Sequence, residues 1–167
     1  FEDLFTVDMA VENPLRQKQL FALNQNYDKF QLMLNLNLFY QYPRNSLQLN
    51  NADGTFSEIA NYSGMAETEW SWAPLIIDFD NDGWKDLFIA GGDVQTNTEK
   101  FSSRASKQTN LILHNNADGT FSPNPVGAPA WHRGAAFADF NHDGAIDVAV
   151  TRLGESPLIH WGTKSAN

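Results

Sequence analysis

A unit of a little over 60 residues is written twice in this chain, and this repetition constrains the fold more than any other feature. The segment Asn45-Ser-Leu-Gln-Leu-Asn-Asn-Ala-Asp-Gly-Thr-Phe-Ser57 recurs 65 residues later as Asn110-Leu-Ile-Leu-His-Asn-Asn-Ala-Asp-Gly-Thr-Phe-Ser122. A second pair follows, in which residues 70–90 align with residues 131–151 at an offset of 61. An internal period of this length is the signature of a repeat architecture.

A third and incomplete copy opens the chain. Asp3-Leu-Phe-Thr-Val7 matches Asp86-Leu-Phe-Ile-Ala90 and Asp147-Val-Ala-Val-Thr151. The loop that precedes the other two copies does not precede Asp3. We therefore expect that the chain is read from partway through a larger array.

Each unit reads as short β-strands. Leu47-Gln-Leu49 and Leu111-Ile-Leu113 are apolar and are each closed by Asn-Asn-Ala-Asp-Gly, and Asp-Gly between apolar runs is a strong hairpin signal because Gly tolerates positive φ. A second hairpin follows, which gives four strands per unit and predicts an all-β chain of four-stranded antiparallel blades of the β-propeller type. A stacked solenoid or a sandwich remains an alternative.

Two segments interrupt the repeat. Residues 14–44 are predicted to be a helical insertion, because apolar residues recur near helical spacing at Leu20, Leu23, Tyr27, Phe30 and Leu34. Residues 91–109 are polar and aperiodic, and they are predicted to form a long surface loop. The predicted organisation is the end of a truncated unit (1–13), the helical insertion (14–44), a unit with a long loop (45–109), a second unit (110–161) and a tail (162–167).

Two acidic loops carry the chemistry. The first has oxygen-bearing side chains at its positions 1, 3, 5 and 9, namely Asp78, Asp80, Asp82 and Asp86, with Gly83 at position 6 for a sharp turn. Alternate residues point to the same side of a curling chain, and the turn should aim the backbone carbonyl of Trp84 inward, as in an EF-hand loop. A flexible cage of hard oxygens suits Ca²⁺ better than Mg²⁺.

The second loop repeats the pattern with one carboxylate fewer. Its predicted ligands are Asp139, Asn141, Asp143, the carbonyl of Ala145, and Asp147. Carboxylates about 4 Å apart repel by roughly 1–4 kcal/mol per pair, a cost that a bound cation removes. The sequence thus predicts about two calcium sites, of which the second binds calcium more weakly.

The alternative is that Asp, Asn and Gly serve only as turn formers through Asx-turns. The Asn-Asn-Ala-Asp-Gly segments at Asp53 and Asp118 lack the alternating acids and are interpreted as hairpin turns.

Composition excludes several functions. The formal net charge is −9, which disfavours nucleic acid. There is no cysteine, so disulfides and thiolate chemistry are excluded. No apolar stretch is long enough to span a bilayer. The four histidines (His114, His132, His142 and His160) fit no zinc pattern, and no catalytic constellation is present, so we expect a non-catalytic chain.

Aromatic residues suggest both core and contact roles. Trp70 and Trp131 occupy equivalent repeat positions and are predicted to lie in the blade core. Trp84 lies within a loop and is predicted to be an exposed contact residue. His142 occupies an outward position of the second loop and is predicted to be solvated.

These motifs together resemble a known family. The segments from Phe79 to Phe88 and from Arg133 to Asp139, Trp70-Ser-Trp72 and the two Asn-Asn-Ala-Asp-Gly-Thr-Phe-Ser segments are similar to FG-GAP/VCBS repeats of bacterial proteins related to cartilage acidic protein 1, which often carry an ASPIC/UnbV domain. The resemblance implies a secreted or cell-surface propeller with calcium held in loops between strands, and it implies no catalytic residues. The chain departs from the family in length, since two and a fraction units cannot close a ring of about four to eight blades.

The expected function is that of an extracellular calcium-binding repeat module. Its expected partner is a protein or carbohydrate ligand at the cell surface. The alternative is a structural subunit in which open-ended blades join as a homo-oligomer or a fibre.

Overall fold

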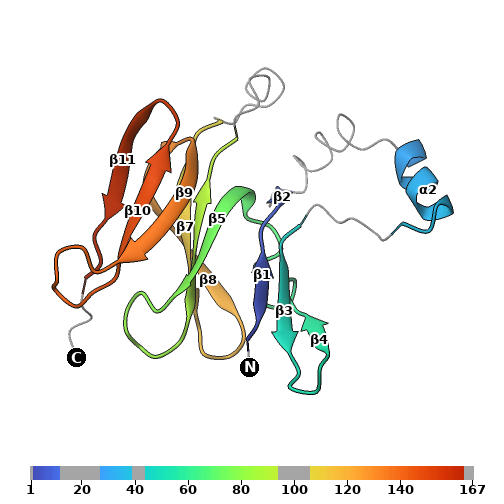
Figure 1. Cartoon of the computed structure of the whole chain (residues 1–167), viewed down its shortest axis with the longest axis horizontal. Coiled ribbons are helices and arrows are strands. Elements are labelled where there is room, and N and C mark those ends of the chain that lie inside the picture. Colours follow the sequence, from blue (N-terminus) through green and yellow to red (C-terminus); the bar gives the residue numbers. More distant parts are fainter. Residues whose placement is uncertain (1, 12–26, 39–43, 94–105, 164–167) are drawn as a thin grey trace.

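The computed structural model describes residues 2–11, 27–38, 44–93 and 106–163, which form three antiparallel sheets and one helix (Figure 1). The N-terminal sheet has the order β1 (Leu4–Thr6), β3 (Ser46–Asn50), β4 (Phe56–Glu58). The middle sheet has the order β2 (Met9–Ala10), β5 (Glu69–Ile77), β6 (Asp86–Gly91), β7 (Gln108–Asn115), β8 (Phe121–Ala130). The C-terminal sheet has the order β11 (Glu155–His160), β10 (Asp147–Arg152), β9 (His132–Ala138).

The predicted all-β class with antiparallel sheets is confirmed, and the middle sheet contains four strands that are consecutive in the sequence. Strands β5 to β8 pair in sequence order, each antiparallel to the next, and β2 adds a short fifth strand beside β5. Helix α2 (Tyr27–Asn35) lies within the predicted insertion. The rest of that prediction at 14–26 and 39–43, and most of the predicted loop at 94–105, fall outside the described residues.

The three sheets share one register. The pairs Phe5↔Leu47, Phe88↔Ile112 and Ala149↔Ile159 occupy the same position in each. The opening segment is therefore a third copy of the repeat, as predicted. Because β6 pairs with β7, hydrogen bonding crosses the sequence boundary between 45–109 and 110–161, and a blade combines the end of one unit with the start of the next.

Strand β6 is buried along its whole length, because both of its faces are covered. Successive side chains of a strand point to opposite faces. Leu87 and Ile89 belong to one apolar cluster, whereas Phe88 and Ala90 belong to another. The middle sheet thus contributes to two cores, one on each side.

The two cores are built by the same rule. Phe5 and Val7 of the N-terminal copy pack against the cluster that holds Leu87 and Ile89. At equivalent positions, Phe88 and Ala90 pack with Val148 and Val150 of β10. One face of each blade therefore meets the opposite face of the next, and burying a large apolar side chain there stabilises the fold by about 1.5–3 kcal/mol.

Tryptophan positions agree in part with the prediction. Trp70 is buried, as predicted for the blade core. Trp131 is partly exposed, and the Nζ atom of Lys107 lies 5.1 Å from its ring centroid.

Within the described residues, no helix has both the length and the apolar character needed to cross a bilayer.

Two histidines lie in the interface between the middle and C-terminal sheets. The ring of His160 lies 5.8 Å from that of Phe88, and its Nε2 atom lies 2.9 Å from Nδ2 of Asn110. The fully buried His132 donates from Nδ1 to the carbonyl of Gly91 at 3.0 Å. Burial lowers the pKa of both imidazoles.

We expect the free energy of unfolding to decrease as the pH falls from about 7 to about 5 in a chelating buffer. The unfolded histidines bind protons near their ordinary pKa of about 6.5, whereas the folded chain holds both pKa values lower, so protons favour the unfolded state in this window. This contribution to stability is complete above about pH 6.5 and is lost as the pH falls toward the folded pKa values. Urea unfolding at a series of pH values measures the slope.

A matched pair of variants assigns the slope to the interface. His160→Leu introduces the residue that occupies the equivalent position at Leu113, and it should flatten the pH dependence. His142→Ala, which removes an exposed histidine outside the interface, is the matched control. Identical slopes in wild type and His160→Leu would contradict this assignment.

Candidate metal centre

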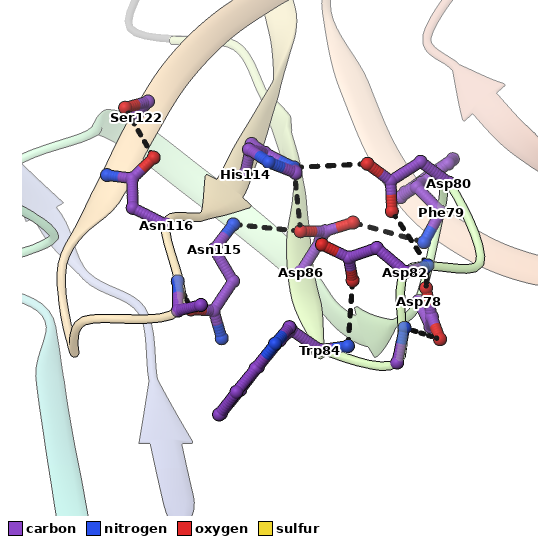
Figure 2. Close-up of polar contacts among 12 residues, drawn as sticks. Asp78, Phe79, Asp80, Asp82, Trp84, Asp86, His114, Asn115, Asn116 and Ser122 are labelled. Carbon is purple, nitrogen blue, oxygen red and sulfur yellow. Dashed lines mark hydrogen bonds and ion pairs between the residues drawn. The ribbon is translucent and has the colours of Figure 1, made fainter. Parts of the chain in front are cut away.

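The first acidic loop joins β5 to β6 and gathers three carboxylates. Oxygen atoms of Asp78, Asp80 and Asp82 lie within 4.8 Å of one another. Figure 2 shows these side chains turned toward a common region, while the indole of Trp84 points away from it. The odd positions of the loop therefore converge.

Local backbone geometry produces this convergence. Asn81 and Gly83 have positive φ values of 58° and 94°, which curl the chain tightly. The amide of Asp82 donates to Oδ1 of Asp78 at 3.1 Å and the amide of Gly83 to Oδ2 of Asp78 at 3.1 Å. Asp78 thus lies at the centre of the turn and accepts bonds from the far side of the loop.

Asp86 closes the loop from a buried position. Its side chain is 1% exposed. Its Oδ2 atom accepts the amide of Phe79 at 3.1 Å, and its Oδ1 atom accepts the amide of Asn115 at 2.8 Å. The carboxylate therefore ties the start of the loop to the neighbouring strand β7.

The second loop, between β9 and β10, reproduces these bonds. The amides of Asp143 and Gly144 donate to Asp139 at 3.1 and 2.9 Å. The fully buried Asp147 accepts the amides of Phe140 at 2.9 Å and Gly162 at 2.8 Å. The two loops share one backbone scaffold although their side chains differ.

The loops differ at four positions, two of which are predicted ligand positions. Asn141 replaces Asp80, and its Nδ2 atom donates to Oδ2 of Asp143 at 2.8 Å, a contact that two carboxylates would make repulsive. Trp84 is 51% exposed, whereas Ala145 at the equivalent position is fully buried. Inward-pointing backbone carbonyls at these two residues stay a prediction. His142 is exposed, as predicted.

The donor set fits a hard divalent cation. Carboxylate and amide oxygens are the ligands that Ca²⁺ prefers. Each carboxylate oxygen has a second lone pair after it accepts one N–H bond, so the bonds described above leave ligand capacity. The same bonds hold the loops as Asx-type turns, so turn formation and ion binding are compatible roles of one set of side chains.

The Asn-Asn-Ala-Asp-Gly segments are hairpin turns, as predicted. Strand β3 pairs with β4 and β7 with β8 across them. In each turn the aspartate, Asp53 or Asp118, accepts both the amide and the hydroxyl of the threonine two residues later. The side-chain hydrogen bond from this threonine lowers the pKa of the aspartate in both turns.

The structure places one further residue, which sequence reasoning missed, beside the acids of the first loop. His114, on β7, has its Nδ1 atom 3.2 Å from Oδ1 of Asp86 and 3.6 Å from Oδ2 of Asp80. Figure 2 shows the imidazole directed toward these carboxylates. No local sequence signal pointed to His114, because it approaches Asp86 only through the pairing of β6 with β7.

Comparison with protein families identifies the repeat. A family model described as an FG-GAP-like repeat matches residues 20–89 and 98–150. A search of curated proteins found no match to the chain.

We expect Gly83→Ala to destabilise the protein by about 1–2 kcal/mol, because a left-handed backbone is costly for a residue with a Cβ atom. A Cβ atom at Gly83 meets nothing within 4 Å, so the variant measures backbone strain without a steric clash. Urea unfolding in a chelating buffer checks the value. Lys85→Ala, at an exposed position of the same loop without positive φ, is the control, and equal stabilities of the two variants would contradict the strain argument.

Proposed function

Because this chain belongs to the FG-GAP-like repeat family, we propose that it is a non-catalytic module that binds Ca²⁺ in its two acidic loops and takes part in extracellular protein or glycan binding. Repeats of this family are generally extracellular binding and adhesion modules. The proposal includes the closer relation to the ASPIC/UnbV proteins that the motifs suggest.

The observation that carries the proposal is the repetition of the loop. Two separate segments place oxygen donors at the same positions with the same backbone bonds. A turn alone would need one Asx residue and a glycine. The first loop instead gathers a cluster of three carboxylates, whose repulsion a divalent cation converts into attraction.

The proposed ligands follow from the loop positions. Calcium in the first loop would be held by Asp78, Asp80, Asp82, Asp86 and the carbonyl of Trp84. In the second loop it would be held by Asp139, Asn141, Asp143, Asp147 and the carbonyl of Ala145. Affinities of about 10⁻⁴–10⁻³ M suffice for extracellular calcium modules.

The ion would stabilise the places where neighbouring strands of one sheet are tied together. Asp86 bonds to Asn115 of the adjoining hairpin, and Asp147 bonds to Gly162 after β11. A ligand that binds only the folded state stabilises it by RT ln(1 + [L]/Kd), or about 2.7 kcal/mol at a hundredfold excess over Kd. Calcium would therefore strengthen the links between strands as well as the loops.

Exposed aromatic side chains beside the loops support a binding role. Trp84 is 51% exposed within the first loop, and Trp161, which adjoins the Gly162 that bonds Asp147, is 57% exposed. Tryptophan is enriched at binding sites because it offers a large apolar surface with a hydrogen-bond donor. We propose these two side chains as ligand contacts.

Self-assembly through sheet edges is the alternative. Strands β4 and β11 are the outermost described strands of their sheets. However, β11 carries Glu155 and Pro157, and charge and proline are devices that protect an edge from pairing. The binding module is therefore favoured over the fibre.

Calcium should raise the melting temperature of the protein above its value in EGTA. The first loop should bind calcium more tightly than the second, because it has four carboxylates and the second has three. Isothermal titration calorimetry on Asp139→Asn, which weakens the second loop, and on Asp78→Asn, which weakens the first, measures each loop separately. A melting temperature that is the same in calcium and in EGTA would refute the calcium proposal.

An exchange of one ligand provides the matched control for the order of affinities. Asp80→Asn gives the first loop the ligand set of the second, and Asn141→Asp does the reverse. The first variant should weaken calcium binding and the second should strengthen it. The opposite signs would show that loop charge does not set the affinity.

Size-exclusion chromatography with calcium separates the module from the fibre. The binding module should elute as a discrete particle whose size is independent of protein concentration. Growth into long assemblies on addition of calcium, seen by negative-stain microscopy, would favour the fibre instead.

A further inference from the structure

We propose that the first acidic loop is a mixed nitrogen–oxygen site that also binds a divalent transition-metal ion such as Zn²⁺, with Asp80, Asp86 and His114 as its protein ligands. The inference extends the proposed function, since it uses two carboxylates of the proposed calcium loop and assigns that loop a second class of ion. It distinguishes the first loop from the second.

Distances among the three side chains favour a shared ion. The Nδ1 atom of His114 lies 3.2 Å from Asp86 and 3.6 Å from Asp80, and one ligand atom of each residue lies within 4.8 Å of the others. Zinc–nitrogen and zinc–oxygen bonds are about 2.0–2.2 Å long, so two ligands of one ion lie about 3.0–3.5 Å apart. Only small side-chain movements would bring the three ligands to that separation.

The site is held in place by the backbone. Asp86 is buried, and its two oxygens accept the amides of Phe79 and Asn115. Asn115 directly follows His114 on β7, so strand pairing fixes the imidazole and the carboxylate relative to each other. Hydrogen bonds that orient a ligating carboxylate in this way are typical of metal sites.

Ligand chemistry decides which ions respond to His114. An imidazole nitrogen suits Zn²⁺ and its neighbours in the first transition row, whereas Ca²⁺ prefers oxygen ligands throughout. A structural reading is that His114 forms an ion pair with the two carboxylates. In that case its removal would leave zinc affinity unchanged.

The repeat provides an internal comparison. Residues equivalent to His114 in the other two copies are Leu49 and Trp161, and neither side chain binds zinc. Among the described copies, only the loop at 78–86 therefore has an imidazole supplied at this position of the adjoining strand. Calcium and zinc should compete at that loop because they share Asp80 and Asp86.

Calorimetric titration of the full chain, with any affinity tag removed, tests the inference with ZnCl₂ and CaCl₂ in parallel. His114→Leu introduces the residue found at Leu49 and should weaken zinc binding about tenfold or more, the scale on which second-shell losses already act, while calcium affinity stays the same. Asp82→Asn should show the reverse, since Asp82 belongs to the calcium set and not to the zinc set. His142→Ala controls for zinc held by an exposed histidine of the second loop.

The outcomes separate the two proposals. Equal zinc affinities in wild type and His114→Leu overturn the mixed site and leave the calcium proposal standing if calcium binds. Zinc binding that depends on His114 in a chain that ignores calcium overturns the calcium proposal alone. Nuclear magnetic resonance of the histidine rings in the wild type needs no variant: zinc should shift the His114 signals first, and a shift confined to other histidines would overturn the inference.

Discussion

A buried aspartate at the start of the second strand of a blade is the constraint on which the geometry of each acidic loop depends. Asp86 and Asp147 each accept one amide from their own loop and a second amide, from the last residue of β7 for Asp86 and from Gly162, beyond β11, for Asp147. Burying a carboxylate is costly unless its oxygens are bonded, so these hydrogen bonds offset the cost of burying Asp86 and Asp147. These hydrogen bonds fix each buried carboxylate relative to the other acidic side chains of its loop.

Face-to-face packing of the blades explains why strand β6 tolerates so little polarity. Strand β6 contributes Leu87 and Ile89 to one core and Phe88 and Ala90 to the other. From Leu87 to Ala90 its sequence is a continuous apolar run for this reason, whereas a strand with one solvent-exposed face would alternate apolar and polar residues.

The sequence repeat revealed the strands, the hairpin turns and the all-β class, because these depend on local residues such as Asp-Gly. The sequence did not show which four strands form one blade, because β6 and β7 pair across a long loop that carries no periodic signal.

The candidate site was predictable to a similar degree. The positions of the acids within each loop follow from spacing alone, and the structure brings Asp78, Asp80 and Asp82 together. His114 was not predictable in this way, because it lies 28 residues after Asp86 and reaches that carboxylate only through strand pairing. Histidine motifs are recognised by their short spacing along the sequence. A histidine that comes from a neighbouring strand has no such spacing to the acids of the loop.

Nearly identical backbones with different side chains point to how the two loops diverge. The positive φ values recur at Asn81 and His142 and at Gly83 and Gly144, so the turn itself is constant. Asp80 is exchanged for Asn141 without loss of the turn, because the side-chain oxygen of each accepts the amide two residues later. His114 on the adjoining strand β7 is exchanged for Trp161, which follows β11, and both lie outside the turn. Because the scaffold is held by backbone amides, such exchanges alter the charge and the donor atoms offered to an ion without altering the turn that presents them. If the loops bind ions as proposed, these few side chains set the ion preference, and the turn determines where the ion would lie.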